Sequence, residues 1–99
     1  MVQDNEGKTF LHYASRQGSI DSVKYILECI PPESRHEYLM VQDNEGKTSL
    51  HYAIRWDSTD TVKYILDCIP SESRHELLMV QDNEGKTSLH YASARWYGS

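Results

Sequence analysis

The sequence MVQDNEGKTSLHYA at residues 40–53 recurs without a change at 79–92, and residues 1–14 differ from it only at Phe10. It contains Gly-Lys-Thr, the tripeptide that closes the phosphate-binding loop of many nucleotide hydrolases. A repeated structural unit would explain the same letters without any ligand. The rest of the chain decides between these two interpretations.

The repeat extends well beyond this stretch. Residues 1–39 and 40–78 align without a gap and are identical at 30 of 39 positions, whereas the third copy leaves the pattern in its last letters, ARWYGS. We therefore expect one domain built from two full units, 1–39 and 40–78, and a partial third unit, 79–99.

Composition limits the class of partner. The chain has 99 residues, a net charge of -5 and 38% hydrophobic residues. The acidic balance argues against a general attraction to nucleic acid or to anionic membranes. No apolar run approaches the roughly 20 residues of a membrane span, and no export signal opens the sequence. We expect an intracellular, cytoplasmic protein with neither a nucleic-acid nor a membrane partner.

The two cysteines, Cys29 and Cys68, occupy equivalent positions in the two full units. Helices of stacked units pack about 8–10 Å apart, which exceeds the roughly 7 Å between Cα atoms that a disulfide tolerates. We expect reduced, mostly buried cysteines, as is usual inside cells.

Each full unit contains an amphipathic segment, which reads SIDSVKYILECI at 19–30 in the first copy. Its apolar residues recur at the spacing i, i+3, i+4, i+7, which is typical of one face of an α-helix. This stripe consists of Val23, Ile26, Leu27 and Ile30, and of Val62, Ile65, Leu66 and Ile69 in the second copy. The expected N-caps are Ser19 and Ser58, and a proline marks the end of each helix.

A turn and a shorter helix are expected before this segment. The letters DNEG are a turn signature, and a threonine that can cap a helix follows two residues later. The turn glycines are Gly7, Gly46 and Gly85, and the capping threonines are Thr9, Thr48 and Thr87. Leu11 and Ala14 would face inward. Gly18 would end the first helix with a positive φ, which Asp57 in the second copy adopts less readily.

These letters resemble a known family. DNEGKTFLHYA and its two copies are similar to the ankyrin-repeat signature D-x-x-G-x-T-P-L-H-x-A, and DSVKYILE and DTVKYILD are similar to the second-helix segment of that repeat. The resemblance covers nearly the whole chain. It implies an all-α fold, an ankyrin-like repeat solenoid of stacked helix-turn-helix units joined by β-turns, with two full repeats and a partial third.

Two features depart from the family pattern. The usual proline after the threonine is replaced by Phe10, Ser49 and Ser88, so the first helices start without a preset φ. The units have 39 residues instead of about 33, and the additional residues follow the second helix. A capping-box pattern occurs there, at Ser34/Glu37 and at Ser73/Glu76. It predicts an extra helical turn in each unit.

The sequence argues against an enzyme and against a bound cofactor or metal. A phosphate-binding loop needs another glycine five residues before the one in Gly-Lys-Thr, where this chain has Val2, Val41 and Val80. Equivalent histidines of neighbouring units would lie roughly 10 Å apart, whereas the ligands of one zinc ion each lie about 2 Å from it. HEYLM and HELLM do not complete the H-E-x-x-H motif, and no set of nucleophile and base recurs.

The resemblance implies that the repeated histidine ties the turn to the start of the first helix. The residues with expected structural roles are Gly7, Thr9, His12, Gly46, Thr48, His51, Gly85, Thr87 and His90.

The resemblance also implies a protein-binding module that presents its turn tips and first helices on a concave face. Carried over by position, the candidate contact residues are Asn5, Glu6, Lys8, Arg16, Gln17, Asn44, Glu45, Lys47, Arg55, Trp56, Asn83, Glu84 and Lys86. Trp56 beside Arg55 is the foremost candidate, because aromatic and arginine side chains dominate interface hot spots. Alternatively, Trp56 covers a neighbouring repeat. The sequence does not identify the partner protein.

The third copy has a first helix but no second helix to cover it, so Leu89 and Ala92 would lack part of their packing. Trp96 and Tyr97 could fold back over this end. Alternatively, the chain could form a homo-oligomer through the incomplete repeat, as a dimer or an end-to-end polymer. The near-identical copies also suit a fragment of a longer array or an engineered array.

Overall fold

The computed structural model describes residues 3–56 and 59–92, which form helices and turns without a strand. The first unit holds α1 (Phe10–Arg16), α2 (Ile20–Glu28) and α3 (Pro32–Leu39). The second unit holds α4 (Ser49–Arg55), α5 (Thr59–Asp67) and α6 (Ser71–Leu78), and the third begins with α7 (Ser88–Ala92). The predicted all-helical repeat architecture is confirmed. The predictions for Asp57, Ser58, Trp96 and Tyr97 lie outside the described residues.

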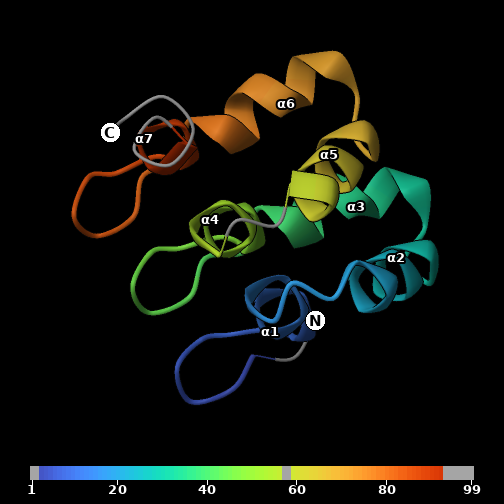
Figure 1. The fold of residues 1–99 in the computed structure, drawn as a ribbon, viewed down its shortest axis with the longest axis horizontal. Coiled ribbons are helices and arrows are strands. Elements are labelled where there is room, and N and C mark those ends of the chain that lie inside the picture. The colour runs from blue at the N-terminus through green and yellow to red at the C-terminus, as the bar shows by residue number, and fades with distance from the viewer. Residues whose placement is uncertain (1–2, 57–58, 93–99) are drawn as a thin grey trace.

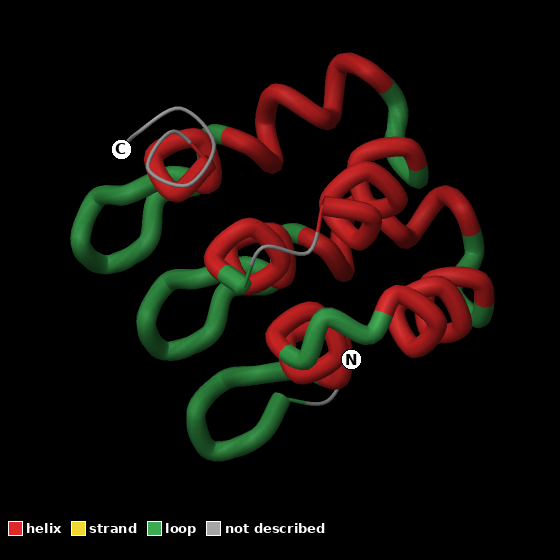
Figure 2. Tube along the Cα trace, viewed as in Figure 1, coloured by secondary structure: helices red, strands yellow, loops and turns green. Residues whose placement is uncertain are grey.

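The helices stack in two rows (Figure 1). One row consists of α1, α4 and α7, with α4 packed between the other two, and the second row contains α2 and α5. Helices α3 and α6 return the chain from the second row to the next turn. The three turns that precede α1, α4 and α7 project from the same side of the stack (Figure 2).

The apolar stripes predicted from the sequence form the core between the rows. Val23 and Leu27 of α2 are completely buried, as is Ile65 of α5. Helix α7, the first helix of the third unit, is less well covered than α1 and α4. Its Leu89 is 45% exposed, whereas the equivalent leucines of α1 and α4 are completely buried. The prediction of incomplete packing is thus confirmed for Leu89 and wrong for Ala92, which is buried.

The first helices are capped as their sequence predicts. In α1, Thr9 Oγ1 accepts a hydrogen bond from the backbone N–H of His12, and the His12 ring accepts one from the backbone N–H of Thr9. The same reciprocal pair caps α4. Ser19 precedes α2 at the expected position but makes no side-chain capping bond, because its hydroxyl donates to Ser22 instead. Gly18 has the predicted positive φ, at 70°.

The additional residues of each unit form helices α3 and α6, each eight residues long. The extra helix is confirmed, but the predicted capping box is wrong, because α3 already begins at Pro32 and Ser34 lies inside it. A proline fits the first helical position, where no amide hydrogen is needed. Arg35 on α3 donates from Nε to the carbonyl of Leu27 at 2.9 Å, which adds a second donor to a carbonyl at the end of α2 that already accepts from the backbone N–H of Ile30.

The cysteines are free, as predicted. Their predicted burial is wrong for Cys29, which is exposed, while Cys68 is half-buried. Cys29 follows the last residue of α2 and lies between Leu27 and Ile30, the residues that face the core. Its side chain therefore points away from the apolar stripe.

No helix within the described ranges is long and apolar enough to cross a membrane. The same ranges contain no group of three histidine, cysteine, aspartate or glutamate side chains placed to hold a metal ion.

The turn glycines allow consecutive turns to approach each other closely. Gly7, Gly46 and Gly85 have φ values of 77°, 80° and 78°. A Cβ atom on Gly46 would lie 2.6 Å from Oδ1 and 2.8 Å from the backbone nitrogen of Asn83, whereas a Cβ on Gly85 would meet nothing within 4 Å. Gly46 is therefore required for stacking as well as for the turn, and Gly85 for the turn alone.

This difference provides a matched pair of substitutions. We expect Gly85→Ala to lower the free energy of unfolding by about 1 kcal/mol, because of its positive φ. Gly46→Ala should cost about 1–3 kcal/mol more, because the methyl group collides with the next turn. Urea denaturation followed by circular dichroism measures both. Equal losses would contradict the close contact between turns.

Candidate protein-binding surface

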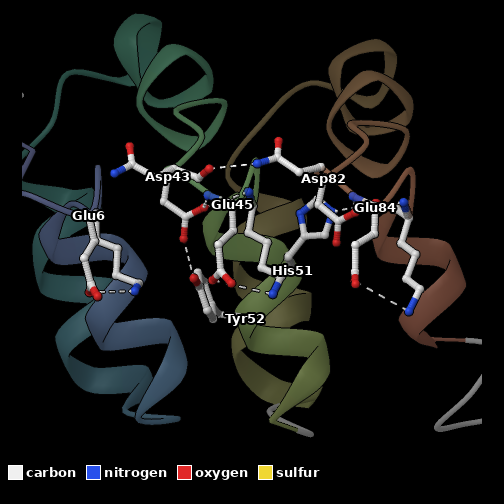
Figure 3. Close-up of polar contacts among 12 residues, drawn as sticks. Glu6, Asp43, Glu45, His51, Tyr52, Asp82 and Glu84 are labelled. Carbon is white, nitrogen blue, oxygen red and sulfur yellow. Dashed lines mark hydrogen bonds and ion pairs between the residues drawn. The ribbon is translucent and has the colours of Figure 1, made fainter.

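Each turn is held to its first helix by an aspartate. In the second turn, Asp43 Oδ1 accepts hydrogen bonds from the backbone N–H groups of Glu45 and Lys47, both at 2.9 Å. Its Oδ2 accepts a hydrogen bond from the hydroxyl of Tyr52 on α4 (Figure 3). The first and third turns repeat this arrangement. The turn tips are therefore fixed relative to the helices behind them.

These contacts alter the acid–base properties of both partners. Burial and the bond to Asp43 hold the pKa of Tyr52 well above its ordinary value. Burial and the bond to Asp82 raise the pKa of Tyr91 to about 12. Burial alone would raise the pKa of Asp82, but hydrogen bonds from Tyr91 and from two backbone amides outweigh it and leave this pKa lowered. At neutral pH both tyrosines are thus neutral hydrogen-bond donors, and Tyr91 donates to an ionised Asp82.

The repeated histidines join neighbouring units as well as capping their own helices. The Nδ1 atom of His12 accepts from the backbone of Thr9, so its Nε2 carries the proton and donates to the carbonyl of Lys47 at 2.9 Å. His51 contacts the carbonyl of Lys86 in the same way at 3.2 Å. Burial lowers the pKa of both imidazoles, which keeps them neutral.

Two adjoining hollows lie where the turn tips meet the first helices. The larger measures about 460 Å³ and is lined by Glu45, Lys47, Arg55, Asp82, Asn83 and Glu84. The smaller measures about 250 Å³ and is lined by Lys8, Arg16, Glu45, Lys47, Tyr52, Arg55 and Trp56. Because three residues line both hollows, they form one continuous surface, which we call the tip groove.

The two ends of the tip groove differ in charge. Carboxylates outnumber cations in the hollow between the second and third turns, whereas cations outnumber carboxylates in the hollow between the first and second turns. Each turn lysine lies near the glutamate of its own turn, as Lys8 does to Glu6 at 2.9 Å (Figure 3). Arg16 and Arg55 make no ion pair with any described residue. These two guanidinium groups remain available to a partner.

Trp56 follows α4 directly and lines the smaller hollow, next in sequence to Arg55, which lines both. It is 52% exposed. The guanidinium carbon of Arg16 lies 6.0 Å from the centre of its ring, which is within the range of a cation–π contact. The ring thus covers part of the preceding repeat, as one interpretation of the sequence predicts, and still offers about half of its surface to solvent.

Most of the predicted contact residues line the tip groove. These are Lys8, Arg16, Glu45, Lys47, Arg55, Trp56, Asn83 and Glu84. The predicted residues outside its lining are Asn5, Glu6, Gln17, Asn44 and Lys86. The side chain of Asn44 donates to the carbonyl of Asn5 at 3.0 Å, so it is engaged in holding the turns together.

Two residues of the tip groove, Tyr52 and Asp82, were not predicted from the sequence. A signal exists, because every turn aspartate is followed by a tyrosine nine residues later. Because almost every residue of this stretch recurs in each copy, every spacing within it recurs too. The nine-residue spacing alone therefore does not identify a contact. The pairing becomes evident only when the turn folds back onto the helix.

The aspartate–tyrosine contact can be tested with a matched pair of conservative substitutions. Tyr52 is 6% exposed, and Tyr52→Phe removes the donor to Asp43. We expect it to lower the free energy of unfolding by about 1–2 kcal/mol. Tyr25 is 71% exposed, and Tyr25→Phe should change that free energy by less than about 0.5 kcal/mol. Similar losses for both variants in chemical denaturation would refute a structural role for the hydroxyl of Tyr52.

The buried histidines predict how stability depends on pH. Because the folded protein lowers the pKa of His12 and His51, the unfolded chain binds protons first, near its ordinary value of about 6.5. Stability should therefore be full above that pH and decline as the pH falls towards about 5. Thermal unfolding across this range measures the decline. The double variant His12→Gln/His51→Gln should be less stable at pH 7.5 but should show a flatter profile, and an unchanged slope would contradict the assignment.

Comparison with known proteins agrees with this geometry. A family model described as ankyrin repeats in three copies matches residues 1–73 and 37–98. The comparison with curated proteins gave no match. Ankyrin repeats are generally protein–protein interaction modules, and the family is typically non-enzymatic. Because the matched residues cover nearly the whole sequence and the helices stack as repeats, the chain belongs to the ankyrin-repeat family.

Proposed function

We propose that this chain binds a protein partner through the tip groove. The observation that carries the proposal is the continuity of the two hollows across neighbouring turn tips, with the half-exposed ring of Trp56 in the smaller hollow beside Arg55, which lines both. Tryptophan and arginine side chains are common at binding hot spots.

The stiffness of the groove supports this proposal. The turn tips are held by the bonds to Asp43 and Asp82, and the tyrosine donors come from the first helices α4 and α7. A surface that is already ordered loses little conformational entropy on binding. Contacts of modest area can therefore give useful affinity.

The charge of the groove indicates the chemistry of the partner. The guanidinium groups of Arg16 and Arg55, which make no ion pair with a described residue, line the smaller hollow with Trp56, and arginine pairs well with carboxylates. Asp82 and Glu84 line the other end. We therefore expect a partner segment that places an acidic and apolar stretch over the first two repeats and a basic stretch towards the third.

The test begins with an affinity pull-down that identifies the partner. The double variant Arg55→Ala/Trp56→Ala should then bind that partner at least about 30-fold more weakly in isothermal titration calorimetry, because hot-spot residues contribute about 2 kcal/mol or more. Lys63→Ala is the matched control, because Lys63 is exposed on α5 in the second row. It should leave the affinity unchanged. Equal affinities for the double variant and the unsubstituted chain would overturn the proposal.

A further inference from the structure

The two ends of the stack expose large apolar side chains that the interior buries. At the first end, Phe10 is 75% exposed, although the equivalent residues Ser49 and Ser88 of α4 and α7 are completely buried. At the last end, Leu89 and Met79 are 45% and 46% exposed. Position 10 of each unit therefore faces the preceding repeat, and the leucine after it faces the following one.

The hydrogen bonds between turns have a fixed direction. The backbone N–H of Asn44 donates to the carbonyl of Glu6, and that of Asn83 donates to the carbonyl of Glu45, both at 2.9 Å. The amide side chains of the same two asparagines donate to the asparagine carbonyl of the preceding turn, at 3.0 and 2.8 Å. The later turn is thus the donor at each of these contacts. Two side chains of the earlier unit donate the other way. The histidine ring donates to the later turn, and so does the glutamine, from Gln3 Nε2 to the carbonyl of Gln42 at 3.3 Å and from Gln42 Nε2 to the carbonyl of Gln81 at 3.1 Å.

At the ends, the same groups lack these partners. The backbone and side-chain N–H groups of Asn5 have no acceptor within residues 3–56 and 59–92. Within those ranges the carbonyls of Asn83 and Glu84 receive no hydrogen bond, and His90 Nε2 has no partner. The first turn therefore presents donors where the third turn presents acceptors, and the sequence QDNEGKT is the same in both.

We propose that this chain associates head to tail with a second copy of itself. The first turn and α1 of one copy stack on the third turn and α7 of the next, as each unit stacks on its neighbour within the chain. Asn5 donates to the carbonyls of Asn83 and Glu84 of the second copy, and His90 of that copy donates to the carbonyl of Lys8. The contact continues an interface that the chain already makes twice.

The C-terminal end has a place for the aromatic ring of Phe10. A shallow hollow of about 270 Å³ is lined by Met79, Thr87, Leu89 and His90, and its lining is mainly apolar. Within the chain, position 10 is a serine with no exposed surface. The larger ring at this one position therefore suits the contact between chains, where the hollow is open.

The pairing of hydrogen bonds favours this arrangement over a symmetric dimer. A head-to-tail contact reproduces the bonds that consecutive turns already make within the chain. A symmetric dimer would have to pair these groups in an arrangement that the described residues make nowhere. The head-to-tail contact leaves one end open at each step, so growth continues beyond a dimer unless the chain closes into a ring.

Two blocking variants test the proposal. Phe10→Glu blocks the first end and leaves the last end intact, and Leu89→Glu does the reverse. Both side chains are exposed, so both variants should keep the circular dichroism spectrum of the unsubstituted chain. They should also keep its thermal unfolding midpoint at dilutions where the unsubstituted chain is a monomer, because association itself raises the midpoint. Sedimentation velocity over a range of concentrations then measures the mass of each protein alone and of the equimolar mixture.

We expect the unsubstituted chain to grow in mass with concentration beyond a dimer. Each variant alone should remain a monomer, and the mixture should form a one-to-one dimer that grows no further. A monomeric unsubstituted chain at every concentration would overturn the proposal. So would a dimer of Phe10→Glu alone, which would indicate paired C-terminal ends, or a dimer of Leu89→Glu alone, which would indicate paired N-terminal ends.

A third variant tests the hydrogen bonds themselves. Asn5→Ala removes a side-chain donor that has no acceptor among the described residues of its own chain. It should weaken association by about two- to tenfold without changing the unfolding midpoint. Lys63→Ala is the matched control, because Lys63 is exposed on α5 of the second row and lies outside the turns. Unchanged association of Asn5→Ala would overturn the proposed continuation of the hydrogen bonds.

Discussion

The close approach of consecutive turns sets the geometry on which the rest of the stack depends. A Cβ atom on Gly7 would lie 2.7 Å from the side-chain oxygen of Asn44, so only a residue without a side chain admits the next turn at this distance. The hydrogen bond from the backbone of Asn44 to Glu6 requires the same approach. Because the second and third turns repeat it, the first helices are held at a constant spacing, and the tip groove is a consequence of that spacing.

Features that depend on local sequence were predictable. The spacing of apolar residues predicts the second helices, and the capping threonines predict where the first helices begin. The DNEG sequence predicts the turns and the positive φ of their glycines. The prediction failed where two local signals compete. Ser34 belongs to a capping-box pattern, but Pro32 is itself a good first residue of a helix, and α3 begins there. Cys29 is a similar case. Its apolar character predicted burial, but its position just after the last residue of α2 leaves its side chain exposed.

Features that join distant residues were not predictable from the letters. The bond from Arg35 to the carbonyl of Leu27 exists because the chain turns between α2 and α3, which brings Arg35 back to the end of α2. The bond from Tyr52 to Asp43 exists because the turn folds back onto α4. The near-identity of the copies makes such contacts harder to predict. Two residues that touch recur at a constant spacing, but so do all the other residues of the repeat. The lining of the tip groove therefore required the three-dimensional arrangement.

The differences between the copies lie where they leave the spacing of the stack unchanged. The two full units are identical in the turn and in every residue of the threonine–histidine cap, which are the parts that contact the next unit. Trp56 replaces the glutamine of the first copy on the surface of the tip groove, and Phe10 replaces a buried serine at the one end where no described repeat precedes it. Ser49 and Ser88 are completely buried, so the internal copies of this position hold a small side chain. Phe10 is 75% exposed, and its ring leaves every contact between the described repeats intact.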